Sequence, residues 1–173
     1  LREEAQRCAT KLWSYTRFLL KLARDATDAP AQPTLADRWT GGRYNTLPAA
    51  VNRLMEAYQF GIAGRLIYDF LWGDFCDWYI EIVKLRLGGP DGTPDQQAAA
   101  GAYACLLHVL EGALRLLSPM MPFITEEIWH AIYDGQTPLK SVALAALPRA
   151  NSQQLGVVPQ DELRVVARSS EKV

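Results

Sequence analysis

The chain has few cysteines and histidines, and they are scattered. Its three cysteines, Cys8, Cys76 and Cys105, form no CxxC pair, and its two histidines, His108 and His130, are not clustered. Metal sites and redox centres need such groups at close spacing, and a disulfide framework uses an even number of cysteines. We therefore expect structural cysteines, no metal site and a location in a reducing cytoplasm.

Long apolar runs and a basic excess are also missing. No apolar run approaches the roughly 20 residues that span a bilayer, so no membrane partner is expected. The first residues lack the layout of a signal peptide, and the start without Met indicates a piece of a longer protein. The net charge is −1, whereas nucleic-acid-binding modules are usually basic. If this domain binds RNA, its cations must be gathered on one face.

Motifs for catalysis are absent as well. The chain has no GxxxxGK[ST] phosphate loop, no GxSxG elbow and no HExxH helix. Two carboxylate pairs, Asp74 with Asp77 and Glu126 with Glu127, are close in sequence. Neighbours on a helix do not face each other, and residues three apart usually lie on a solvated or capping surface. We expect this chain to be no enzyme by itself and to hold no cofactor.

Apolar residues recur at three- and four-residue spacing along most of the 173 residues, with Pro- and Gly-rich segments between the periodic stretches. The pattern predicts an all-α fold, an antiparallel bundle of about five helices. The predicted helices span residues 2–25, 34–58, 60–87, 95–117 and 122–133. The bundle is expected to occupy residues 1–147, and a polar extension that could begin a further helix is expected at residues 148–173.

Individual residues predict where the helices begin or bend and which of their faces are buried. Thr34 can cap the second helix, and Pro48, with Gly41 and Gly42, should bend or divide it. Pro122 fits the first position of the fifth helix. The expected buried stripe of the first helix is Ala5, Cys8, Ala9, Leu12, Trp13, Thr16, Leu19, Leu20 and Ala23. The expected buried face of the third helix is Ala63, Ile67, Phe70, Leu71, Trp78 and Ile82.

The first helix is the basic part of the chain. Its cations are Arg2, Arg7, Lys11, Arg17, Lys21 and Arg24. Arg17, Lys21 and Arg24 share one face, and Phe18 sits beside them, slightly off the apolar stripe. An aromatic ring next to a guanidinium is what single-stranded RNA recognition uses, with a base on the ring and the cation on a phosphate. The alternative is an ordinary solvated face with Phe18 in the core.

Four segments carry a family resemblance. Residues 11–18 read Lys-Leu-Trp-Ser-Tyr-Thr-Arg-Phe, and residues 69–81 contain Phe-Cys-Asp-Trp-Tyr-Ile-Glu. Residues 119–129 read Pro-Met-Met-Pro-Phe-Ile-Thr-Glu-Glu-Ile-Trp, and residues 35–39 read Leu-Ala-Asp-Arg-Trp. Together they resemble the anticodon-binding bundle of valyl-tRNA synthetases, which also has a K-L-[WY]-N-A-x-R-F segment and a W-x-[ED]-F-C-D-W-Y-[LI]-E element. The P-x-x-P-F corner is shared with leucyl and isoleucyl enzymes.

This resemblance implies that the chain binds the anticodon loop of a tRNA for valine. In the family, the bundle reads the second and third anticodon bases, adenine and cytosine. Phe18 matches the aromatic that stacks on the third base, and Ile80 and Glu81 match positions near the second base. A carboxylate suits either base, because adenine N6 and cytosine N4 are both hydrogen-bond donors. The implied RNA-binding residues are Lys11, Ser14, Arg17, Phe18, Lys21, Ile80 and Glu81.

Structural roles are the expectation, or the alternative, for other residues of these segments. Glu81 has the alternative of a solvent-facing ion pair with Lys84, three residues on. Ser14 stands where the family commonly has asparagine. Large aromatics at helical spacing are expected in the core, namely Trp72, Phe75, Trp78 and Trp129. Aspartates of the third helix are expected to cap, pair or orient neighbours within the bundle, namely Asp69, Asp74 and Asp77.

The implied partners are the tRNA(Val) anticodon loop and the catalytic and editing domains of the same parent chain, where ATP would act. The chain itself is expected to be a monomer. Two alternatives stay open. The bundle could come from an isoleucyl or leucyl enzyme, against which the Phe-Cys-Asp-Trp run at residues 75–78 argues. It could also be a helical protein-interaction module without an RNA role, which the acidic balance beyond the first helix motivates.

Overall fold

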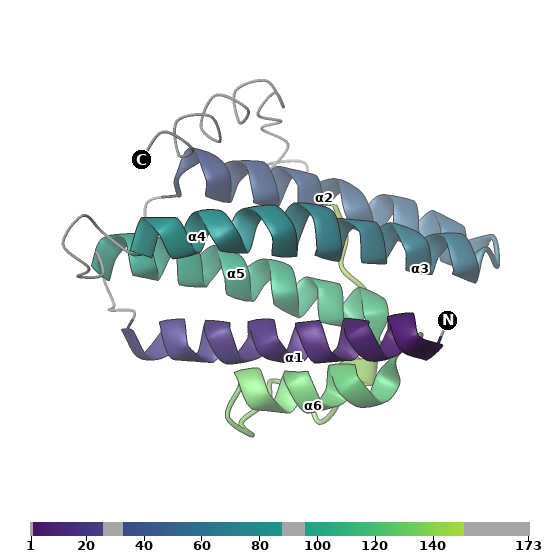
Figure 1. The fold of residues 1–173 in the computed structure, drawn as a ribbon. Coiled ribbons are helices and arrows are strands. Elements are labelled where there is room, and N and C mark those ends of the chain that lie inside the picture. The colour runs from purple at the N-terminus through teal and green to yellow at the C-terminus, as the bar shows by residue number, and fades with distance from the viewer. Residues whose placement is uncertain (1, 26–32, 88–95, 151–173) are drawn as a thin grey trace.

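The computed structural model describes residues 2–25, 33–87 and 96–150. Over these ranges it is a bundle of five helical rods without strands, as predicted (Figure 1). The rods are α1 (Arg2–Asp25), α2 (Leu35–Glu56), the continuous run of α3 (Phe60–Asp69), η1 (Phe70–Tyr79) and α4 (Ile80–Leu87), α5 (Gln96–Leu117) and α6 (Pro122–Ile132). A short 3-10 turn, η2 (Val142–Leu144), follows. Most of the predicted C-terminal extension, from residue 151 on, lies outside the described residues.

Rods that follow each other in sequence run antiparallel, and α5 lies in the middle of the bundle (Figure 1). It packs against α1, α2, α3, α4 and α6. The close approach of α2 shows at Gly112, where an added Cβ would lie 1.7 Å from the Tyr44 hydroxyl oxygen. The stretch Ala99–Leu117 of α5 is long and apolar enough to cross a membrane, which qualifies the expectation that no such run exists. Most of it is buried inside the bundle, as in the core helix of a globular protein.

The start of α2 is fixed by Thr34, as predicted. The Thr34 side chain accepts a hydrogen bond from the Asp37 backbone N–H, and the Asp37 carboxylate accepts one from the Thr34 backbone N–H at 2.8 Å, which forms a capping box. Pro48 lies inside α2 but does not divide the helix. Residues on both sides of it, among them Tyr44 and Val51, are buried. The packing of that face holds the helix together across the one backbone donor that proline removes.

The middle of the third rod is a π-helix, η1, and this overturns part of the predicted buried face. A π-helix closes i→i+5 hydrogen bonds, seen here from the Ile80 N–H to the Phe75 carbonyl oxygen, and so takes up more residues per turn than an α-helix. The burial pattern is displaced by one residue after it. Tyr79 and Val83 are buried, whereas Trp78 is 48% exposed. The prediction that Trp78 lies in the core is therefore wrong.

The predicted buried stripe of α1 is confirmed at its centre, but the prediction is wrong for Trp13 at its margin. Leu12, Thr16 and Leu19 are buried, together with Leu22, which the prediction missed. Trp13 is 38% exposed, because the centre of the stripe falls one position away from it. The predicted stripe positions Ala5, Cys8 and Ala23 lie outside the described side chains.

The cysteines that are described behave as packing groups. Cys76 is buried and Cys105 is partly buried, and no disulfide joins them. Burial raises the pKa of the Cys105 thiol to about 12, against a smaller lowering by its hydrogen bond with Tyr79. Cys8 lies outside the described side chains.

Candidate nucleic-acid interface

Side chains of the helix α1 and of the run η1–α4 meet at one face of the bundle, which we call the α1/α4 face. Three contacts between side chains of the two rods define it. The Lys11 Nζ lies 3.9 Å from the Asp77 Oδ1 and 5.0 Å from the centre of the Trp72 ring. The Lys84 Nζ lies 5.9 Å from the centre of the Phe18 ring. Residues more than 60 positions apart in sequence are thus brought together.

Lys11 is held in place from two directions. Asp77 attracts its ammonium group, and the face of Trp72 offers a cation–π contact. Trp72 is itself stacked on Tyr68, with ring centres 4.6 Å apart and an angle of 7° between the planes. An exposed ion pair of this kind contributes at most about 1 kcal/mol to stability. The main consequence is that the cation has a defined position at the surface.

Phe18, Glu81 and Lys84 form the second cluster of the face. Phe18 is half-buried, so part of its ring packs on the core and part faces outward. The Lys84 Nζ beside this ring also lies 2.6 Å from the Glu81 Oε1. The ion pair expected as the alternative for Glu81 is therefore confirmed. This ion pair does not bury Glu81, because the Glu81 side chain remains 56% exposed.

The remaining polar positions of α1 lie on the same side. Ser14, Phe18 and Lys21 follow Lys11 at three, seven and ten residues, which places all four along one stripe of the helix, and Arg17 lies next to it. Arg17 and Lys21 are exposed. The Ser14 hydroxyl is exposed too and donates to the Thr10 carbonyl oxygen at 2.9 Å. The side chains of Arg2, Arg7 and Arg24 lie outside those that the structure describes.

Ile80 does not belong to the exposed face. Its side chain is 1% exposed and part of the hydrophobic core. The displacement of the buried face by the π-helix explains this, because it turns the position before Glu81 inward. The Ile80 side chain therefore offers no exposed surface to a base, and the implied location of this position near the second anticodon base stays a prediction. Its role is to anchor the helix on which Glu81 is exposed.

Among its described side chains, the α1/α4 face carries more positive than negative charge, although the chain as a whole has a net charge of −1. Its two carboxylates belong to Asp77 and Glu81. Its four cations are those of Lys11, Arg17, Lys21 and Lys84. Tyr15 lies between the two rods, and burial, followed by the effects of Cys76 and Asp77, raises the pKa of its hydroxyl group above the usual value. It therefore stays neutral and does not offset the excess of positive charge.

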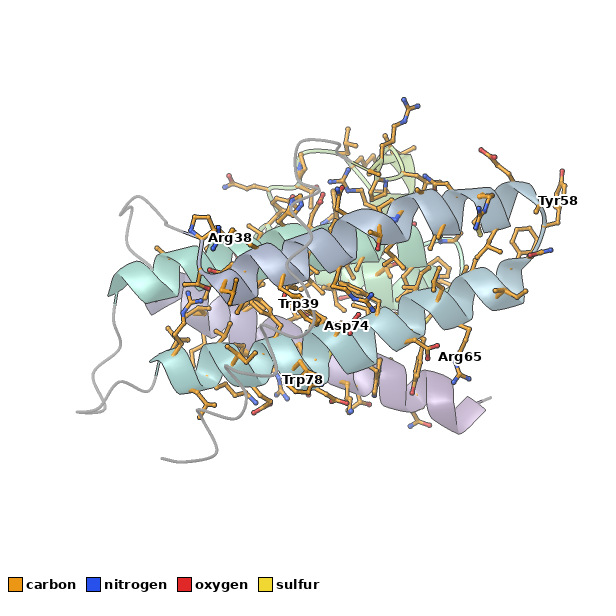
Figure 2. The ribbon with its side chains drawn as sticks, turned by 90° about the horizontal axis from the view of Figure 1, so that it is seen from above. Arg38, Trp39, Tyr58, Arg65, Asp74 and Trp78 are labelled. Carbon is orange, nitrogen blue, oxygen red and sulfur yellow. The ribbon has the colours of Figure 1, made fainter. Side chains whose placement is uncertain are left out.

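Several contributors were missed because their roles depend on contacts between helices. Lys84 appeared in the sequence only as a partner for Glu81, and Trp72 only as a core residue. Trp72 is partly buried, whereas Phe75 and Trp129 are buried as predicted. The expected pairing of the aspartates is confirmed, with shortest distances of 2.9, 2.7 and 3.9 Å in the pairs Asp69–Arg65, Asp74–Arg43 and Asp77–Lys11. In Figure 2, Asp74 lies between η1 and α2, and its partner Arg43 belongs to α2.

Comparison with known proteins finds one matching family model and several similar tRNA ligases. Residues 37–172 match the family model described as the anticodon-binding domain of tRNA ligase. The chain is 45% identical over 150 residues to a valine–tRNA ligase of Symbiobacterium thermophilum and 45% identical over 129 residues to one of Dehalococcoides mccartyi. It is 36% identical over 163 residues to the valine–tRNA ligase of Geobacillus kaustophilus.

The match covers most of this chain and a small part of each relative. For the Symbiobacterium thermophilum relative it covers 84% of this chain and 16% of the relative. The corresponding shares are 73% and 14% for Dehalococcoides mccartyi, and 91% and 18% for Geobacillus kaustophilus. The chain thus spans less than a fifth of the length of these relatives.

Proposed function

Because this chain belongs to the family of anticodon-binding domains of tRNA ligases, we propose that it binds the anticodon loop of a tRNA through the α1/α4 face. The observation that carries the proposal is the cluster of Phe18, Lys84 and Glu81. It combines an aromatic ring, a cation and a carboxylate, which are the groups that hold a base, a phosphate and an amino edge of single-stranded RNA.

In the proposed complex, phosphate contacts position the loop and base contacts identify it. Lys11, Arg17 and Lys21 lie along one side of α1 and bind successive phosphates. A base stacks on the exposed part of the Phe18 ring, a contact worth roughly 1–3 kcal/mol. The Glu81 carboxylate accepts a hydrogen bond from the exocyclic amino group of adenine or cytosine. The ion pair with Lys84 holds this carboxylate at the same surface.

The proposal extends to the parent protein as a valine–tRNA ligase of the cytoplasm. The relatives reported above bear that name, and the Phe-Cys-Asp-Trp-Tyr run of residues 75–79 resembles the corresponding element of that family. This chain would supply binding, while valine activation with ATP, transfer to tRNA(Val) and editing would belong to other domains of the parent protein. The bundle of an isoleucyl or leucyl enzyme remains the nearest alternative.

A titration with the anticodon stem-loop of tRNA(Val) tests the proposal. Binding is followed by the anisotropy of a fluorophore on the RNA at two salt concentrations. We expect Phe18→Ala to weaken binding about 5- to 150-fold, which corresponds to the free energy of one base stack. Binding should weaken as salt rises, since phosphate contacts release counterions. Changing the second anticodon base should weaken it further.

The outcomes separate the alternatives. Binding that follows salt but ignores both the base change and Phe18→Ala would leave a generic RNA-contacting bundle. Binding that prefers the isoleucine or leucine stem-loop would reassign the parent enzyme. No binding by this chain or by the longer parent protein would favour the protein-interaction module.

A further inference from the structure

Trp78 is a large aromatic side chain at the surface, 48% exposed. Tryptophan is usually well buried on average, so its exposure on a structured helix calls for an explanation. Glu81 and Leu85 follow at three and seven residues and therefore lie on the same stripe of the rod. Leu85 is 66% exposed. The outer side of η1–α4 thus presents an indole, a carboxylate and an aliphatic group in a row, and Figure 2 shows Trp78 on this rod.

The outward position of Trp78 follows from the π-helix. In an α-helix that continued the phase of Ala63, Ile67 and Phe70, position 78 would face the core and position 79 would face outward. In the structure, Tyr79 is buried instead. π-helical segments occur frequently at functional sites, because they turn particular side chains outward or inward.

This register is locked by a buried contact to α2. The Tyr79 hydroxyl donates to the Asp37 Oδ1 at 2.7 Å. The Arg86 Nη1, about two α-helical turns beyond the π-helix, donates to the same oxygen at 3.1 Å. Returning η1 to α-helical register would withdraw Tyr79 from Asp37 and leave a buried carboxylate with fewer donors, which is costly. Trp78 is therefore presented at the surface in a defined way.

We infer that Trp78 is a second base-stacking platform of the proposed anticodon-loop interface, on the side of Glu81 away from Phe18. This inference rests on the proposed function. One base stacks on Phe18 and a neighbouring base stacks on the indole of Trp78, so that Glu81 accepts from an amino group at their edges. Two platforms around one carboxylate would let this face hold two consecutive bases, each unstacked from its neighbours in the loop.

A nucleobase fits this stripe better than an apolar partner does. A protein or lipid surface that covered Trp78 and Leu85 would also bury the Glu81 carboxylate with its Lys84 partner, and burying an ion pair is expensive unless new hydrogen bonds offset the lost hydration. A base with an exocyclic amino group covers the indole with its π-face and offers a donor to the carboxylate at the same time. The cations of Lys11 and Lys84 on the same face are available to the phosphates of the loop.

The test compares Trp78→Ala with Trp13→Ala as a matched control. Trp13 is also exposed, to 38%, but it comes two residues after Lys11, which places it on the opposite side of α1. Trp78→Ala should weaken binding of the tRNA(Val) anticodon stem-loop about 5- to 150-fold, and Trp78→Phe should recover part of the loss. Trp13→Ala should bind like the unmodified chain. Circular dichroism shows whether each variant keeps its helical content.

A second series replaces each anticodon base in turn by an abasic nucleotide. If the indole stacks on a base, one abasic position will make Trp78→Ala and the unmodified chain bind equally well. The inference fails if Trp78→Ala binds as tightly as the unmodified chain while Phe18→Ala binds more weakly, and the proposed function then stands. It also fails if Trp78→Ala loses the same factor with every abasic RNA. If the unmodified chain and its parent protein both fail to bind, the proposed function falls and the inference falls with it.

Discussion

Asp37 offers a sharp test of what holds α2 to the third rod. Its side chain is 2% exposed and accepts hydrogen bonds from the Thr34 backbone N–H at 2.8 Å and the Tyr79 hydroxyl at 2.7 Å. The Arg86 Nη1 donates to the same carboxylate at 3.1 Å. Asp37→Ala removes all three contacts at once. We expect a large loss of stability, because the donors left behind include a buried hydroxyl and a guanidinium group that is 20% exposed.

The size of this loss follows from the three contacts. Removal of an N-terminal helix cap costs about 1 kcal/mol. The buried Tyr79 hydroxyl would keep only its weaker hydrogen bond with the Cys105 thiol, and the loss of its carboxylate acceptor costs roughly 1–3 kcal/mol. The hydrogen bond from charged Arg86 is worth roughly 1.5–3 kcal/mol, and we take the lower end because Arg86 keeps a bond to the Thr34 Oγ1 at 2.8 Å. The expected decrease in the free energy of unfolding is about 4 kcal/mol. For a chain of this length it lowers Tm by roughly 8–16 °C.

Urea and thermal unfolding, followed by circular dichroism, measure this change. Asp69→Ala is the matched control, since Asp69 is 54% exposed and pairs with Arg65 on the surface of the same rod. That control should lose less than about 1 kcal/mol. Tyr79→Phe should lose about 1 kcal/mol, because Asp37 keeps its other two donors. The reasoning is refuted if Asp37→Ala loses no more than Asp69→Ala, since the buried network would then contribute nothing beyond an exposed ion pair.

Two further predictions concern packing and thiol reactivity. Gly112→Ala should destabilise the protein by roughly 1–3 kcal/mol in urea unfolding, because the added Cβ collides with the buried Tyr44 ring. In contrast, Gly41→Ala, with no atom within 4 Å of its added Cβ, should stabilise α2 by about 0.5–1 kcal/mol. Because burial raises the pKa of Cys105 to about 12, its thiolate is scarce below that pH. In a Cys8→Ala background, native protein at pH 8 should react with a thiol reagent far more slowly than urea-unfolded protein; equal rates would contradict the burial of Cys76 and Cys105.

The sequence predicted those features that depend on local signals. The extent of α1 follows from the spacing of its apolar residues. The cap at Thr34 follows from a side chain that can accept from the backbone N–H three residues on, and the start of α6 at Pro122 follows from a residue without an N–H. The π-helix could not be predicted in this way. Its register depends on the bond of Tyr79 to Asp37, which lies 42 positions earlier and on another rod. The error at Trp78 comes from that long-range contact.

The same distinction between local signals and long-range contacts applies to the residues of the candidate site. Residues of α1 such as Lys11 and Phe18 were predicted, because a helix face can be read from the sequence and the resemblance covers that segment. Lys84 and Trp72 were not recognised as parts of the face. Their significance comes from packing between rods, through the contact of Lys84 with Phe18 and of Trp72 with Lys11. Periodicity within one helix carries no information on which faces of two helices meet.

The net negative charge of the chain is only weak evidence against an RNA role. Buried or surface ion pairs occupy many of its carboxylates, such as Asp37 with Arg86, Asp74 with Arg43 and Glu111 with Arg115. A carboxylate bound to a cation at short range contributes little field at the distance of an approaching phosphate, especially beyond a Debye length of about 8 Å at physiological salt. Arg17 and Lys21 of α1 have no ion-pair partner among the described carboxylates. An RNA that approached this surface would meet a positive charge among the described side chains, and the acidic balance is therefore weaker support for a purely protein-binding module.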